Sequence, residues 1–480
     1  MSKTILTDGD EGVQLIVKTK GKAKNKVKAD PQTAVREPVH VVYGGADRFK
    51  ADTAAKLGGI ALKTMSDFAP NFIEFAHAVR LPGTESLPTF PDAAEKLAKQ
   101  IAKDPKKAKE FHHASWFAWT VYQKTLAKLQ NEPVEDFRID FEDGYGYRSD
   151  EEEDRDAANA AAELVASYEK RINPTFTGIR VRSLGGGSRS RAFRTLDIFL
   201  SSFLKNSDRQ LPLGFRVTLP KVSDKKEVKD LISHLKKLEK KYSIAEGTIE
   251  VEILIETPTA IVDDKGNVAI RQIVDAGKGR IASAHFGAYD YTSSVGIVSS
   301  HQHLRHDACN FARQMMLVAL APTGVRLSDS VTTELPIVIH KGAKLTRQQT
   351  AENRNSVRKG LAVHFANVYA SMVNGFYQSW DLHPNQLPSR YAAVYAFFLE
   401  AFDGQATRLR GFLDKASQAV LAGSQFDDAA SAEGILNFMR KGVGCGAFTE
   451  SEASEASGMS AEELVSLSFK QIVDSRRSGK

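Results

Sequence analysis

The chain has 480 residues, of which 42% are hydrophobic and 26% are charged, and its net charge is +6. This is the composition of an ordinary globular protein, and no apolar run approaches the roughly 18–20 residues of a membrane span, which excludes a transmembrane protein. Residues 1–12 are polar and acidic and do not resemble a secretory signal, and two cysteines cannot form a disulfide framework, so we expect a reduced, cytoplasmic protein.

The positive charge is concentrated near the start of the chain. Six lysines alternate with small or polar residues between Lys18 and Lys28, and they equal the excess of 65 Lys and Arg over 59 Asp and Glu. Because this segment has no apolar face to bury, we predict that residues 1–35 form a disordered, Lys-rich arm. No aromatic residues are interleaved for base stacking, so a solubilising tail is favoured over a contact with RNA.

From residue 36 onward, short β-branched or apolar runs alternate with amphipathic helical stretches. Eight such runs predict an α/β protein with a (β/α)8 TIM barrel over residues 36–390, rather than an open sheet. The expected strands are Val39–Tyr43, Phe137–Phe141, Gly178–Val181, Phe215–Leu219, Ile249–Ile255, Arg280–Phe286, Val325–Leu327 and Gln378–Leu382.

Two regions do not fit the simple repeat of strand and helix. Residues 59–131 separate the first two strands by far more than one helix, and we interpret them as a helical insertion. Residues 391–480 follow the last strand and also have helical character, including a capping-box start at Ser460. We interpret them as a C-terminal helical extension that closes over the barrel or over a neighbouring subunit.

The chemistry of such barrels lies where the strands end. The second strand ends in Asp140, Glu142 and Asp143, and unpaired buried charges there would cost several kcal/mol. One interpretation is a set of structural ion pairs with Arg138 or Arg148. The interpretation that we favour is functional: the carboxylates support a metal-bound water or orient an arginine.

The third strand ends in Arg180 and Arg182, which strand alternation places on the same side. Arginine offers a planar fork for a carboxylate or phosphate. The following run Gly185–Gly187 precedes a helix and allows close backbone approach, although such turns are common. No phosphate-binding loop of the G-x4-G-K-[ST] type is present.

Glu256 and Asp290 follow the fifth and sixth strands. Two carboxylates at neighbouring strand ends can supply oxygen ligands to Mg²⁺, which keeps its other positions for water and substrate. Either residue alone would more often belong to a structural ion pair.

Taken together and in this order, the strand ends resemble the HpcH/HpaI aldolase and citrate lyase β-subunit superfamily, which belongs to the phosphoenolpyruvate/pyruvate-type TIM barrels. The similarity spans about residues 38–390. It is carried by the turn that bears Arg48, the segment Ile139–Asp143, Arg180 in Ile-Arg-Val, Lys221 in Leu-Pro-Lys, Glu256 in Ile-Glu-Thr-Pro, Asp290 in Phe-Gly-Ala-Tyr-Asp, and His383 in His-Pro-Asn-Gln.

The resemblance implies a Mg²⁺-dependent (or Mn²⁺-dependent) carbon–carbon lyase that acts through a metal-stabilised enolate of a small keto acid or an acyl-CoA thioester. It makes Glu256 and Asp290 the metal ligands. The expected catalytic residues are Arg180, Asp140, Glu142 and Asp143, and the expected substrate-binding residues are Arg48, Arg180, Arg182, Lys221 and His383. The general base is left open between a metal-bound hydroxide, His383 and a residue of the C-terminal extension. We expect a homo-oligomer, as is common in this superfamily.

The chain departs from the family pattern at Arg182, where an asparagine is usual, and in its insertion, so it looks closer to a long branch than to citrate lyase, malyl-CoA lyase or the short pyruvate aldolases. Two alternatives remain. Arg182, Arg189, Arg191 and Arg194 could hold a phosphate or the diphosphate of CoA, in a phosphotransferase that handles phosphoenolpyruvate. The second alternative is a non-catalytic barrel with an RNA-binding arm, although the intact metal-ligand and arginine positions argue against it.

Overall fold

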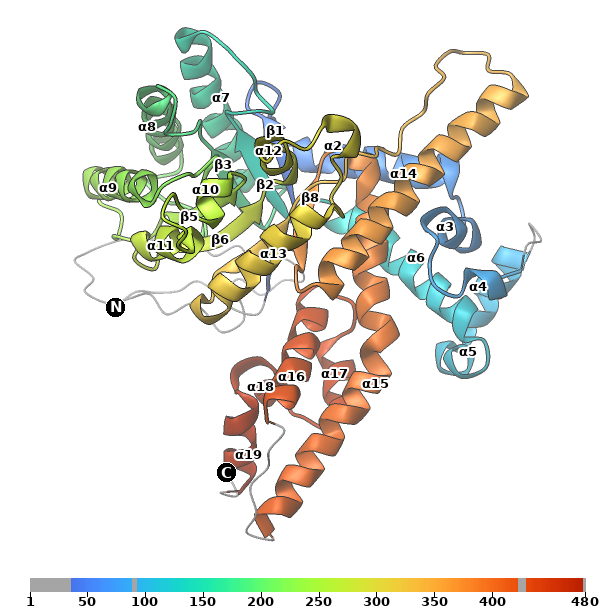
Figure 1. Ribbon diagram of the computed structural model, residues 1–480. Coiled ribbons are helices and arrows are strands. Elements are labelled where there is room, and N and C mark those ends of the chain that lie inside the picture. The colour runs from blue at the N-terminus through green and yellow to red at the C-terminus, as the bar shows by residue number, and fades with distance from the viewer. Residues whose placement is uncertain (1–35, 89–92, 422–428, 478–480) are drawn as a thin grey trace.

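The computed structural model describes residues 36–88, 93–421 and 429–477, so the predicted lysine arm lies outside the described residues. Eight parallel strands form a closed barrel in chain order, with the last strand paired to the first (Figure 1). The predicted (β/α)8 barrel is therefore confirmed. The strands are β1 (His40–Gly45), β2 (Asp136–Asp140), β3 (Phe176–Arg180), β4 (Arg216–Leu219), β5 (Glu250–Ile255), β6 (Ile281–Phe286), β7 (Arg326–Asp329) and β8 (Gln378–Asp381).

Helices surround the barrel and connect its strands. The first of them, α7, begins with a capping box between Ser149 and Glu152, and acidic residues fill its first turn, where the helix dipole favours negative charge. The connecting helices are α7 (Asp150–Glu169), α8 (Arg189–Asn206), α9 (Lys225–Tyr242), α10 (Pro258–Ile261), α11 (Ala269–Ala276), α12 (Ala288–Ser294), η2 (Ser299–His301), α13 (Asp307–Leu320), η3 (Ala321–Thr323), α14 (Arg347–Val373) and η4 (Pro384–Gln386).

The insertion between β1 and β2 is helical, as predicted. Figure 1 shows α3–α6 on the side of the molecule opposite α9 and α11, where α3 contacts α14 and α6 contacts α15. The inserted segment comprises α2 (Thr53–Phe68), α3 (Phe72–Val79), η1 (Thr84–Ser86), α4 (Ala93–Lys103), α5 (Pro105–Phe111) and α6 (His113–Asn131).

The C-terminal extension is also helical. Its long first helix projects away from the barrel, and the later helices pack along it (Figure 1). The helices are α15 (Leu387–Leu421), α16 (Ala429–Gly444), α17 (Glu450–Ser457), α18 (Ala461–Ser466) and α19 (Phe469–Arg477). Among the residues that the structure describes, no helix is both long and apolar enough to cross a bilayer.

A polar network fills the centre of the barrel, where branched aliphatic side chains dominate in most barrels of this type. Arg138 and Glu252 are fully buried and lie 3.0 Å apart, and Arg138 also pairs with Asp136. Thr218 and Ser283 donate hydrogen bonds of 2.8 and 2.7 Å to Glu252. Burial raises the pKa of Glu252, but Arg138, His285 and Arg216 together more than offset this and hold the pKa well below its ordinary value.

Strand register brings the predicted site residues together above this network. Asp140 at the end of β2 is paired with Arg180 at the end of β3. On the other side of the barrel, Ile255 is paired with Phe286, so the residues that follow them, Glu256 and Gly287, are neighbours.

Candidate active site

Arg180 is held by a carboxylate on the neighbouring strand. Its Nε and Nη2 donate to Asp140 Oδ1 and Oδ2 at 2.6 and 2.5 Å. The same carboxylate accepts backbone N–H groups of Glu142 at 3.0 Å and Gly144 at 2.7 Å. Because both oxygens of Asp140 are occupied by these four donors, this residue orients the arginine rather than reacting.

The other two carboxylates of the β2 turn face Lys221. Its Nζ bonds Glu142 and lies 3.1 and 3.0 Å from the two oxygens of Asp143. Nη1 of Arg180 lies 3.3 Å from Glu142 and 4.0 Å from Asp143. Lys221, a predicted substrate-binding residue that follows β4, thus pairs with the acids of this cluster. Burial raises the pKa of Glu142, and the charge of Asp143 raises it further, against the opposing effect of Arg180.

Glu256 is a buried carboxylate, only 2% exposed, at the end of β5. Its Oε1 accepts the backbone N–H of Lys221 at 2.6 Å. Burial and the nearby charge of Asp290 raise the pKa of Glu256 to about 8, although Lys221 and Arg180 lower it. Asp290 lies in the first turn of α12 and is exposed. The two carboxylates that the sequence predicted as metal ligands are therefore close enough to repel each other.

This donor set fits Mg²⁺. Among the residues that the structure describes, no three His, Cys, Asp or Glu side chains gather as a ready-made metal centre, and Glu256 and Asp290 are the two carboxylates that would hold a metal ion here. Mg²⁺ is commonly bound through one or two carboxylates, with its remaining positions taken by water and substrate. A divalent cation would also relieve the repulsion between Glu256 and Asp290 that raises the pKa of Glu256.

The stabilisation of the protein by Mg²⁺ is expected to grow with pH. Since the pKa of Glu256 rises from 4.5 to about 8 on folding, the folded state binds more protons, and its free energy of unfolding falls as pH increases between these values. Mg²⁺ requires the ionised carboxylate, so the increase in Tm at a fixed Mg²⁺ concentration should be larger at pH 8.5 than at pH 6.5, with the pH values set roughly on either side of this pKa. A thermal unfolding series checks this, and an equal or larger increase at pH 6.5 would contradict the assignment.

Gly287 gives Glu256 its space. A Cβ atom at this position would lie 2.4 Å from Glu256 Oε2 and 2.5 Å from Glu256 Cβ. We expect Gly287→Ala to displace the carboxylate and weaken Mg²⁺ binding by roughly tenfold or more. Isothermal titration of Mg²⁺ measures the loss. Gly279→Ala is the control for this substitution, because Gly279 lies at a bend before β6 where an added Cβ atom would meet no neighbour. The positive φ of Gly279 means that this control also adds local backbone strain.

Three of the predicted substrate-binding residues have partners other than the carboxylates of Asp140, Glu142 and Asp143. Arg48 is exposed at the rim, where its Nη2 donates to the carbonyl of Gly144 at 3.2 Å. His383 caps η4, and its Nδ1 accepts the N–H of Asn385 at 3.2 Å. Arg182 bonds Glu153 of α7 at 2.9 and 2.7 Å. Arg182 lies two residues past the end of β3, and its carboxylate partner is Glu153, whereas Arg180 is held by Asp140.

The arginines after the glycine-rich turn are also engaged by carboxylates. Arg191 and Arg194 both bond Asp154, and Arg189 bonds Asp230. Together with the Arg182–Glu153 pair, these contacts join α8 to the acidic start of α7 and to α9. The arginines that we considered as holders of a phosphate or of the CoA diphosphate therefore have protein partners.

Four residues beneath Arg180 were not predicted from the sequence. Tyr43 of β1, Trp380 of β8, Glu252 of β5 and His285 of β6 lie at inward-facing positions below the cluster, and Trp380 Nε1 donates to His285 Nδ1 at 3.2 Å. Polar or aromatic residues at alternating positions of a barrel strand were the available signal, since these positions would otherwise be aliphatic.

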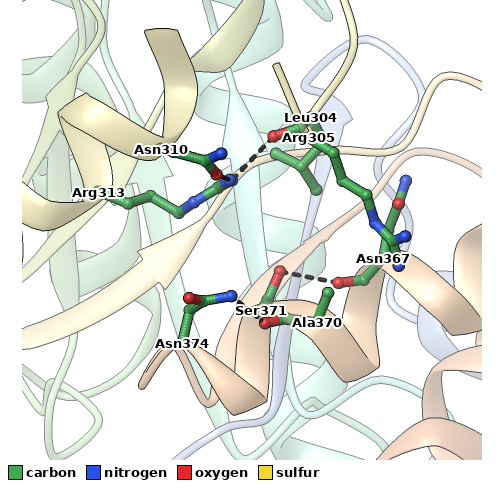
Figure 2. Close-up of a pocket in the computed structure, with 8 residues that line it drawn as sticks. All are labelled: Leu304, Arg305, Asn310, Arg313, Asn367, Ala370, Ser371 and Asn374. Carbon is green, nitrogen blue, oxygen red and sulfur yellow. Dashed lines mark hydrogen bonds between the residues drawn. The ribbon is translucent and has the colours of Figure 1, made fainter. Parts of the chain in front are cut away.

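A separate cavity of about 250 Å³ lies in the outer layer between α13 and α14. Figure 2 shows the residues that line it. Its wall includes Arg313, Ser371 and Asn374, which donate to the backbone carbonyls of Leu304, Asn367 and Ala370 in turn. The predicted site residues do not line this cavity, and its polar groups bond one another.

A family model described as a domain of unknown function, DUF6986, matches residues 21–472. The chain belongs to this family. No curated protein matches the DUF6986 chain.

Among solved structures, the DUF6986 chain is similar to a citrate lyase from Burkholderia xenovorans LB400, with 17% identity, a TM-score of 0.49 and coverage of 70% of this chain and 91% of that one. It is also similar to a magnesium/glyoxylate complex of Haloferax volcanii malate synthase (14% identity, TM-score 0.38, 54% and 66% coverage). An HpcH/HpaI aldolase from Desulfitobacterium hafniense DCB-2 matches at 12% identity, with a TM-score of 0.29 and 54% and 80% coverage.

Proposed function

We propose that this DUF6986 protein is a Mg²⁺-dependent carbon–carbon lyase that cleaves a small 4-hydroxy-2-keto acid. The observation that carries the proposal is the juxtaposition at one barrel mouth of an oriented arginine, a lysine and a pair of mutually repelling carboxylates. Arg180 and Lys221 suit an anionic substrate, whereas Glu256 and Asp290 would hold a divalent cation.

The side chains can be given roles in a balanced retro-aldol step. Nη1 of Arg180, the guanidinium nitrogen that Asp140 does not use, binds the substrate carboxylate. Glu142 accepts the proton of the 4-hydroxyl group, which its raised pKa favours. The C3–C4 bond breaks, the carbonyl product leaves, and the electron pair remains as the enolate of the keto acid. Return of a proton to C3 completes the reaction.

A bound Mg²⁺ would supply positive charge where negative charge develops on the enolate oxygen. Lys221 lies between Glu142 and Asp143 and keeps both acids beside the reacting centre. Its backbone N–H also fixes Glu256, at a position where Lys221 itself adopts a positive φ of 51°. One lysine thus connects the proton-transfer side and the cation side of the site.

The ion pairs around the glycine-rich turn support a free keto acid over an acyl-CoA thioester. Recognition of CoA calls for cations that are available to its diphosphate, whereas Arg182, Arg191 and Arg194 all bond carboxylates of α7. The same pairing gives a phosphotransferase no support from these arginines.

Assays of product release test the proposal: pyruvate is measured for the keto acids and for phosphoenolpyruvate, and the released acyl-CoA is measured for the thioesters. The purified protein is incubated with Mg²⁺ and, in turn, with 4-hydroxy-2-keto acids, 3-hydroxyacyl-CoA thioesters and phosphoenolpyruvate. We expect metal-dependent cleavage of a hydroxy keto acid that chelation with EDTA stops. Turnover confined to thioesters or to phosphoenolpyruvate would contradict the substrate class, and turnover unaffected by EDTA would contradict the metal.

A further inference from the structure

Two aromatic rings cover the guanidinium of Arg180. Its Cζ lies 4.7 Å from the ring centroid of Tyr43 and 5.9 Å from that of Trp380. The rings belong to β1 and β8, which close the barrel, and their centroids are 4.4 Å apart at an interplanar angle of 31°. We call Tyr43 and Trp380 the aromatic pair. Contacts of this kind attract a cation most strongly when the site is desolvated, and Arg180 is only 4% exposed.

The polar tips of the aromatic pair are fixed from below. The hydroxyl of Tyr43 donates to Glu252 at 2.9 Å, and Trp380 Nε1 donates to His285 Nδ1 at 3.2 Å. Since an indole N–H can only donate, Nδ1 of His285 accepts, and its ring carries a proton on Nε2, which lies 2.8 Å from Glu252. Tyr43 is thus tied directly to Glu252, which Arg138 anchors in the barrel centre, and Trp380 is tied to His285.

These contacts restrict Arg180 from two directions. Asp140 occupies Nε and Nη2 along one edge of the guanidinium, and the aromatic pair covers it from another side. The edge at Nη1 is left facing Glu142 at the barrel mouth. An arginine fixed in this way loses little rotamer entropy when it binds an anion, whereas a free arginine side chain would lose more.

We infer that Tyr43 and Trp380 are positioning residues that hold Nη1 of Arg180 ready for the carboxylate of the substrate. The inference rests on the proposed function and deepens it. It explains why inward positions of β1 and β8 carry large aromatic residues with hydrogen-bonded tips, where branched aliphatic residues would fill a barrel interior more simply.

Titration calorimetry with Mg²⁺ and oxalate tests this role, because oxalate is a planar dianion that resembles the enolate of pyruvate. We expect Trp380→Leu and Tyr43→Leu to weaken oxalate binding by about tenfold, the size of one desolvated cation–π contact. Affinity for Mg²⁺ alone should stay within about threefold of the wild type, since Glu256 and Asp290 do not depend on these rings. Trp380→Phe should restore most of the oxalate affinity, because it keeps an aromatic face.

Trp119→Leu is the matched control, since Trp119 is a half-buried tryptophan of α6 in the insertion. Should Trp380→Leu fail to fold, Trp380→Met fills more of the volume without a π face and should show the same loss. In an Arg180→Lys background, Trp380→Leu should weaken oxalate binding much less than in the wild type, because the ring then has no guanidinium to position.

Three results would overturn the inference. The first is unchanged oxalate affinity in folded Leu or Met variants. The second is an equal loss of affinity for Mg²⁺ and for oxalate, which would mark a merely structural role. The third is a wild-type protein that binds Mg²⁺ but not oxalate. This third result would contradict the proposed function as well, whereas the first two would contradict only the role of the aromatic pair.

Discussion

Replacing Glu256 with glutamine is expected to lower the Mg²⁺-dependent lyase activity by at least about 1000-fold while leaving the protein folded. Glutamine has nearly the same shape but cannot provide the anionic oxygen that the cation needs. Folding should not suffer, because burial and the charge of Asp290 make the ionised form of Glu256 unfavourable in the folded state. At pH 8.5, in the absence of metal, we therefore expect the variant to unfold at an equal or higher temperature than the wild type. Steady-state turnover and thermal unfolding provide the two measurements.

Asp275→Asn is the control for this substitution. Asp275 is an exposed carboxylate of α11 that pairs with Arg271 of the same helix, so its loss should change neither turnover nor Mg²⁺ affinity. A Glu256→Gln variant that kept more than about a tenth of wild-type turnover would show that Glu256 is not a ligand of an essential metal.

Replacing Glu252 with alanine should reduce the free energy of unfolding by about 3–5 kcal/mol. Glu252 is fully buried in the barrel centre, and its removal leaves the guanidinium of Arg138 with less compensation for its lost hydration. Thr218 and Ser283 also lose their acceptor. Urea denaturation followed by circular dichroism measures the change, and the denaturation midpoint should fall without a change in slope if unfolding stays two-state.

The Arg194→Ala variant is the control with which the loss of unfolding free energy in Glu252→Ala is compared. Arg194 is an exposed partner of Asp154, and such pairs typically contribute less than about 1 kcal/mol. If the Glu252→Ala variant lost no more stability than the Arg194→Ala variant, the polar network would not be a structural element of the barrel.

The barrel could be predicted because its strands are short apolar runs separated by helical patterns, and that signal is local. All eight predicted strands overlap observed ones, and every boundary agrees within two residues. The proximity of Asp140 to Arg180 and of Glu142 to Lys221 also followed, because in a closed parallel barrel the carboxyl ends of successive strands meet at one face.

The direction of Arg182 and the presence of the aromatic pair did not follow from the sequence. Arg182 lies two residues past the point where strand alternation predicts orientation, and its partner Glu153 belongs to α7, whose position depends on its packing against α8. Tyr43 and Trp380 are 337 positions apart, and they meet only because β8 pairs with β1. Contacts made by barrel closure depend on register, which no local pattern reveals.

The most direct test of the central claim is proton exchange at C3 of pyruvate in D₂O, followed by NMR with the protein and Mg²⁺ present. Exchange requires the enolate but no knowledge of the second product, so it does not depend on the identity of the natural substrate. We expect exchange well above the protein-free rate, and we expect EDTA and the Glu256→Gln substitution each to abolish it. Exchange no faster than without protein, or exchange that persists in the Glu256→Gln variant, would contradict the central claim.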